Sequence, residues 1–186
     1  MMKEYSEFFN LVSKNDSVTR TKILNYFKNY NFKIATEENQ KIIFENKSTW
    51  LNSYKMNFLS LPSKITVHFL EQQKVQIHYQ VIDAGFGALT PIAFTKQYQD
   101  FIRNLDNYIH KNESFQLKNA TLIKSAKIKW LKNTSLLLIA LALGFVLASI
   151  LKKQLVNSWV ISLVIMGTVL ISEKALNAYH VSKNKV

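Results

Sequence analysis

Two long apolar runs occupy the C-terminal third of the chain. Residues 134–151 and residues 155–172 each contain eighteen positions without a charged side chain, and Lys152, Lys153 and Gln154 separate them. Eighteen helical residues rise about 27 Å, close to the roughly 30 Å hydrocarbon core of a bilayer. A helix that is apolar on all sides lies in a large protein core or in lipid. The rest of this chain is too short to wrap two such helices, so we expect a transmembrane helical hairpin rather than a buried hairpin of a soluble fold.

The central part of the chain follows a period of two, which is typical of strands with one apolar face. Apolar side chains alternate with other residues in five segments, which are residues 32–36, 42–45, 54–58, 65–69 and 75–81. Pro62 interrupts the alternation because proline donates no ladder hydrogen bond. The pattern predicts an antiparallel β-meander of four to five strands. If the apolar residues of the last two strands face each other, their connection is an odd loop of about three residues.

Segments with helical periodicity precede and follow the predicted strands. Residues 2–13 place Tyr5, Phe8, Phe9 and Val12 at helical spacing, and residues 18–30 and 91–110 do the same for larger apolar sets. Thr90 followed by Pro91 is a helix-start signal. A basic helix over about 115–133 is expected to continue into the first apolar run. The predicted fold class is therefore α+β, a meander with flanking helices followed by the transmembrane hairpin.

These patterns divide the chain into four parts. We expect a cytosolic α+β head over residues 1–113, a basic juxtamembrane helix over 114–133, the hairpin over 134–173 and a basic tail over 174–186. The spans of the hairpin are about 134–151 and 155–172. No secretory signal is visible at the N-terminus, since it lacks an apolar run of 7–15 residues.

The net charge of +12 is concentrated beside the predicted membrane segments. Residues 1–113 carry 14 basic and 11 acidic side chains, whereas residues 114–186 carry ten lysines and one acid, Glu173. Eight of these lysines flank the outer ends of the hairpin, which by the positive-inside rule predicts cytoplasmic N- and C-termini in a bacterial inner membrane. The expected membrane-interface anchors, facing anionic headgroups, are Lys124, Lys127, Lys129, Trp130, Lys132 and Trp159. Because membrane topology accounts for this charge, we expect no nucleic-acid partner.

Small residues repeat at every fourth position of the first apolar run. Ala140, Gly144 and Ala148 share one helical face, which predicts a helix–helix interface that Gly167 of the second run could help to form. The partner would be the second span or another subunit, so a homo-oligomer is expected. The alternative is that alanine and glycine are simply common in membrane helices.

The head contains two candidate ligand regions. His68 and His78 lie on the polar faces of neighbouring predicted strands, where the alternatives are a ligand-binding face and a solvated sheet face. Gly85 and Gly87 precede the Thr90 helix start, with Lys96 and Arg103 on the helix beyond. Helix N-termini bind anions, but the segment lacks a complete dinucleotide or P-loop motif, and a plain turn is the alternative. The expected occupant of the head is an unknown small ligand or a protein.

Catalytic chemistry finds little support in this sequence. Cysteine is absent, the serines form no nucleophile motif, and no metal-ligand spacing occurs. We therefore expect a membrane-anchored adaptor or sensor, with no cofactor or bound metal and no enzymatic activity. A second hypothesis is an oligomeric pore-forming or membrane-disrupting effector triggered by a ligand of the head. A weaker third is an enzyme with a membrane-embedded substrate.

Overall fold

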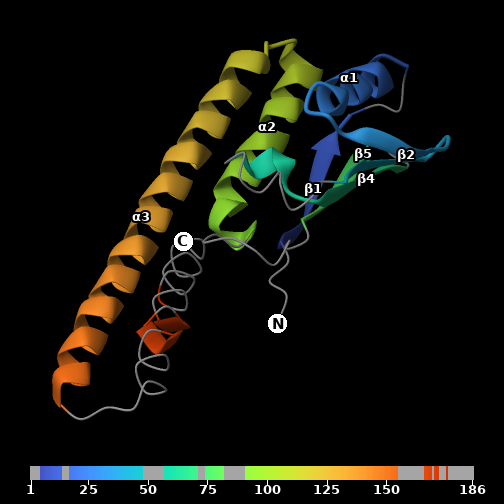
Figure 1. The fold of residues 1–186 in the computed structure, drawn as a ribbon. Coiled ribbons are helices and arrows are strands. Elements are labelled where there is room, and N and C mark those ends of the chain that lie inside the picture. The colour runs from blue at the N-terminus through green and yellow to red at the C-terminus, as the bar shows by residue number, and fades with distance from the viewer. Residues whose placement is uncertain are drawn as a thin grey trace. The chain divides into compact units, whose positions relative to one another are not determined.

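The computed structural model describes residues 5–13, 17–47, 57–70, 74–81 and 91–154, together with 166–168, 170–171 and 175. The described elements, in chain order, are β1 (Tyr5–Val12), α1 (Ser17–Lys28), β2 (Lys33–Glu37), β3 (Lys41–Asn46), the 3₁₀ turn η2 (Phe58–Ser60), β4 (Ser63–Leu70), β5 (Lys74–Val81), the 3₁₀ turn η3 (Pro91–Phe94), α2 (Thr95–Lys111) and α3 (Gln116–Gln154). Figure 1 shows their arrangement. The chain divides into two compact units, 1–127 and 128–186, which are described separately below.

The five described strands form one antiparallel sheet in the order β1-β5-β4-β3-β2. This confirms the predicted α+β class with an antiparallel sheet. In the β4–β5 pair, Val67 lies opposite Ile77 and Leu70 opposite Lys74, so that residues 71–73 connect the two strands. The register aligns the apolar positions of both strands on one side, as the alternation predicted.

The N-terminal segment is a strand, and the helix predicted over residues 2–13 is wrong for its described part. β1 pairs with β5 along its whole length, with Phe9 opposite Ile77. Tyr5 and Leu11 are buried, whereas Phe8 and Val12 of the expected helical stripe are exposed. Because Phe8 and Phe9 are adjacent, Tyr5, Phe8, Phe9 and Val12 match the spacing of a helical face by chance. The unpaired side of β5 decided the outcome, because it offers β1 a ladder of backbone hydrogen bonds.

Two smaller expectations also change. Within the segment predicted as a strand over 54–58, residues 54–56 lie outside the described part of the chain, and Phe58 begins the turn η2. The Asn57 side chain accepts a hydrogen bond from the Leu59 backbone N–H at 3.0 Å. Pro91 begins a 3₁₀ turn, and the α-helix proper starts at Thr95. Thr90, the expected N-cap, lies outside the described residues.

An aromatic core joins the helices to one face of the sheet. Tyr26 and Phe27 of α1 pack against Phe101 of α2 at centroid distances of 4.9 and 6.2 Å. Tyr98 of α2 lies 5.0 Å from Tyr79 of β5, and its ring stacks on that of Tyr5 at 4.6 Å. All of these side chains are buried. The helices α1 and α2 therefore cover one side of the sheet, which makes the expected two-layer arrangement (Figure 1).

The first turns of α3 belong to the head. Asn119 and Ala126 are buried. The first compact unit extends to Lys127, past the boundary expected at residue 113. The Asn119 side-chain amide donates to the hydroxyls of Tyr26 and Tyr30, both at 2.8 Å, and its oxygen accepts from Asn104 at 2.8 Å. One side chain thus links α1, α2 and α3 through hydrogen bonds to three polar partners.

The helix α3 continues without interruption to Gln154, through the whole first apolar run. It includes Lys152, Lys153 and Gln154, which were expected to form the loop between two spans. Most of the second predicted span, 155–172, lies outside the described residues. Its described residues 166–168 and 170–171 are helical.

Candidate binding face on the sheet

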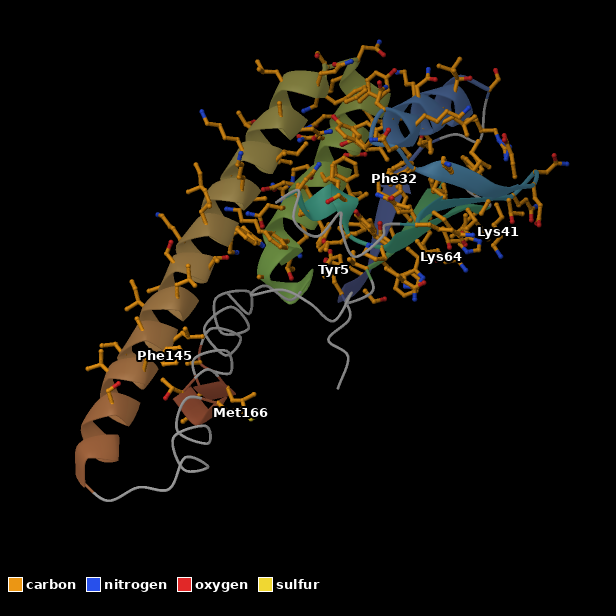
Figure 2. All side chains as sticks on the ribbon, viewed as in Figure 1. Tyr5, Phe32, Lys41, Lys64, Phe145 and Met166 are labelled. Carbon is orange, nitrogen blue, oxygen red and sulfur yellow. The ribbon has the colours of Figure 1, made fainter. Side chains whose placement is uncertain are left out.

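The side of the sheet turned away from α1 and α2 carries the mostly polar residues that alternate with the core residues along each strand. We call this side the open face. The strand registers assign to it Ser6, Phe8, Asn10 and Val12 of β1, Lys74, Gln76, His78 and Gln80 of β5, Lys64, Thr66, His68 and Leu70 of β4, Lys41, Ile43 and Glu45 of β3, and Lys33 of β2. Figure 2 shows Lys41 and Lys64 projecting from it. Because α1 and α2 pack on the core side, the open face is the side of the sheet that they leave uncovered, and we consider it as a candidate binding face.

A stacked ring pair lies on this face. Phe8 of β1 is directly opposite His78 of β5, and their rings are parallel within 5° with centroids 4.0 Å apart. The Ser6 hydroxyl lies 2.8 Å from His78 Nε2, within hydrogen-bonding distance. One face of the Phe8 ring is covered by the imidazole, yet the side chain remains 59% exposed. An exposed aromatic ring held in place by a neighbour is a stacking position for a planar ligand.

The two histidines are diagonal neighbours rather than a facing pair. His78 lies opposite Thr66, and His68 lies opposite Gln76. Burial lowers the pKa of His78, and the electrostatic influence of His68 and Lys64 lowers it further. The lowered pKa favours the neutral imidazole, which suits a stacked ring. No group of three metal-ligating side chains occurs among the residues that the structure describes.

Amide and hydroxyl side chains surround the ring pair. Gln76 donates its amide to the Asn10 side-chain oxygen at 3.2 Å across the β1–β5 pair. Gln80 occupies a half-buried open-face position on β5, whereas Thr66, at the neighbouring position on β4, is buried. Side-chain amides offer both donors and acceptors, and hydroxyls can do either. The surroundings of Phe8 are thus suited to hydrogen bonding with the edges of a planar ligand.

Positive charge is spread across the open face. Each of the strands β2, β3, β4 and β5 contributes one lysine, and these are Lys33, Lys41, Lys64 and Lys74. Glu45 is the one acidic residue at an open-face position in the described strands, and its carboxylate lies 3.4 Å from the ammonium of Lys47. The face therefore favours an anionic partner.

The other residues proposed for the head lie elsewhere. Lys96 and Arg103 are on α2, in the helix layer, where Arg103 pairs with Asp100 at 3.0 Å. The structure thus separates them from His68 and His78, which are on the opposite side of the sheet. Gly85 and Gly87 lie outside the described residues.

The sequence reasoning missed Ser6, Phe8 and Asn10 as members of a site, because it treated residues 2–13 as a helix. A signal was present in the alternation of Tyr5, Glu7, Phe9 and Leu11, of which only Glu7 is polar. On the core side Glu7 is satisfied, since it accepts a hydrogen bond from the Tyr5 hydroxyl at 2.5 Å and another from Gln99 at 3.0 Å.

The residues expected at the membrane are carried mostly by α3. Lys124, Lys127 and Lys132 are exposed, while Lys129 and Trp130 are half-buried. Ala140 is half-buried and Gly144 is buried. A Cβ atom added to Gly167 would meet nothing within 4 Å. The side chain of Ala148 and the whole of Trp159 lie outside what the structure describes.

Comparison of this chain with protein-family models, with curated proteins and with solved structures finds no match.

Proposed function

We propose that this protein is an integral membrane adaptor or sensor, in which a cytosolic α+β head binds a ligand or protein and a C-terminal helical hairpin anchors it in a bacterial inner membrane. The observation that carries the proposal is the exposure of apolar side chains along α3. One helix in the described part of the chain is long and apolar enough to cross a membrane, and only 6% of its apolar window is buried.

The exposed side chains surround the helix rather than forming one stripe. Phe145, labelled in Figure 2, is 52% exposed. The large apolar residues exposed on the second half of α3 are Ile128, Leu131, Leu136, Leu138, Ile139, Leu141, Leu143, Phe145 and Val146. Water would penalise such a surface at roughly 25 cal/mol for each Å² of apolar area, whereas lipid would not.

Lysine placement supports the proposed orientation. Five lysines, Lys118, Lys124, Lys127, Lys129 and Lys132, precede the apolar run on α3, and three more follow the second run in the tail. Two lysines, Lys152 and Lys153, occupy the region between the runs, where they can snorkel to headgroups. This bias favours a head and a tail on the cytoplasmic side.

Cysteine labelling of whole cells tests both the hairpin and its orientation. The chain has no cysteine, so each introduced thiol reports without background. We expect Lys118→Cys and Lys183→Cys to react with a membrane-impermeant maleimide only after lysis, and Gln154→Cys to react in intact cells. Labelling of Gln154→Cys from the cytoplasm alone would refute the hairpin. Labelling of Lys118→Cys in intact cells would refute the cytosolic head.

A further inference from the structure

The open face combines three features that separately suit many ligands. It has a stacked pair of aromatic rings, hydrogen-bonding side chains beside that pair, and lysines on four strands. Phe8 has one ring face covered by His78, and its exposure leaves the other available. A base that stacked there would extend an existing two-ring stack.

The distribution of charge indicates an extended anion. The strand registers place Lys41 and Lys74 toward one end of the strands and Lys33 and Lys64 toward the other, with Glu45 between Lys33 and Lys64. The positive charge is therefore spread over the face rather than gathered in a single phosphate pocket, and an extended chain of phosphates can meet lysines at both ends. The amides of Gln76 and Asn10 and the hydroxyl of Ser6 lie beside the ring pair, within reach of the edges of a stacked base.

We propose that the open face binds single-stranded RNA, with a base stacked on Phe8 and phosphates at Lys41 and Lys74 toward one end of the strands and at Lys33 and Lys64 toward the other. Sheets that bind single strands use exposed rings for the bases and basic side chains for the backbone. This adds a partner that the sequence alone argued against, since the juxtamembrane lysines accounted for most of the charge. It rests on the proposed function in one respect, because a cytosolic head is where RNA is available.

Two other anionic partners fit less well. A lipid surface would favour a continuous apolar patch, but Ser6 and Asn10 flank Phe8 along its own strand. An acidic peptide would use the lysines and would leave the ring stack without a role. Stacking on Phe8 therefore distinguishes RNA from both.

The test is fluorescence anisotropy of a labelled uridine oligonucleotide of about 12 nucleotides, a length within the usual range of single-strand sites. The protein is the full chain in an uncharged detergent. We expect Phe8→Ala to weaken binding about tenfold, since stacking contributes that much or more per base. Val18→Ala is the control, because Val18 is an apolar side chain of α1, outside the open face, and is 60% exposed. It should change the Kd less than twofold.

Charge variants test the lysine contacts to the RNA phosphates. Lys64→Glu and Lys41→Glu should weaken binding, and each lost phosphate contact should lower the slope of log Kd against log salt by about 0.7. Lys96→Glu makes the same change of charge on α2, in the helix layer, and should leave that slope unchanged. Equal weakening by Lys96→Glu would mean unspecific attraction to a basic protein and would overturn the proposal.

Folding and the alternatives are controlled in the same experiment. Thermal melting identifies any unfolded variant, and Phe8→Leu repeats the loss of the ring while keeping an apolar side chain. Equal binding by Phe8→Leu and the native chain would overturn the proposal, as would binding of polyglutamate or phosphatidylglycerol vesicles but not of RNA. Absence of RNA binding with cytoplasmic labelling of Lys118→Cys would remove this inference and leave the proposed function intact.

Discussion

Single residues decide how α3 is fastened to the head. Asn119 is 1% exposed and meets the side chains of Tyr26, Tyr30 and Asn104. Nothing in the local sequence marks this asparagine, because its neighbours on α3 are an ordinary mixture of polar and apolar residues. Its importance follows from burial, since a buried amide must find partners and these partners come from three other positions in the fold.

We expect Asn119→Ala to lower the free energy of unfolding of the head by about 2 kcal/mol. The substitution removes three hydrogen bonds and leaves the hydroxyls of Tyr26 and Tyr30 and the amide of Asn104 without this partner. Urea unfolding of the full chain in detergent, followed by tyrosine fluorescence, measures the effect. Thr121→Ala, an exposed position on the same helix, is the control. Equal midpoints for the two variants would contradict the role of Asn119.

His110 links the end of α2 to the end of β1. Its Nε2 lies 2.5 Å from the Val12 carbonyl oxygen, and its Nδ1 lies 3.0 Å from the Asp106 carboxylate. These hydrogen bonds, with the Val12 carbonyl contributing most, raise the pKa of His110 above 6.5. Both ring nitrogens can donate at the same time only in the protonated form.

Stability should therefore depend on pH through this residue. Because the pKa of His110 is higher in the folded chain than in the unfolded one, its contribution is complete below the unfolded pKa and is lost as pH rises through the folded pKa. We expect the Tm difference between the native chain and His110→Gln to be larger at pH 5.5 than at pH 8.5. A difference that grew with pH would reverse the assigned sign. The side chain is about two-fifths exposed, so the effect is screened by solvent.

At the scale of elements, β1 shows how tertiary pairing overrides local pattern. The helical interpretation of residues 2–13 buries Phe8 and Val12 along with Tyr5, whereas the strand buries Tyr5 and Leu11 and exposes Phe8 and Val12. The two structures make opposite predictions for adjacent residues. Leu11 is 7% exposed and Val12 is 72% exposed.

Leu11→Ala should lower the free energy of unfolding by about 2 to 4 kcal/mol, as expected for truncation of a buried leucine. Val12→Ala should change it by less than about 0.5 kcal/mol, since surface substitutions have small effects. Chemical unfolding of both variants provides the measurement. A larger loss for Val12→Ala would restore the helical interpretation of this segment.

At the scale of the whole molecule, the question is whether the chain acts alone or in an assembly. Gly144 is buried although its neighbour Leu143 is 58% exposed. Small residues at every fourth position allow close approach of another helix, either the second span or another subunit. An oligomer of four or more subunits would favour the pore-forming alternative, and a monomer or dimer would favour the anchored adaptor.

Native mass in mild detergent distinguishes these states. If Gly144 lies in a contact between subunits, Gly144→Ile should shift the protein to smaller species while the melting of the head stays unchanged. Leu143→Ile is the control, because it adds no bulk at an exposed position. An identical subunit distribution for Gly144→Ile and the native chain would remove the proposed contact between subunits.

The sequence by itself was sufficient for the features that depend on local periodicity. The alternation of β3, β4 and β5, the helices α1 and α2 and the length of the first apolar run all follow from which side chains can share a buried face. The register of the β4–β5 hairpin was also predictable, because one residue of slippage would expose Val75, Ile77 and Tyr79.

Only the tertiary structure decided the features that depend on distant partners. β1 is a strand because the edge of β5 offers it a ladder of backbone hydrogen bonds. The first turns of α3 pack with the head, where Asn119 meets Tyr26 of α1 and Tyr30 just beyond that helix. The open face exists as a candidate site for the same reason, since β1 brings Phe8 beside His78 from 70 positions away. Local patterns determine which side chains can be buried together, but the strand order determines which exposed side chains become neighbours.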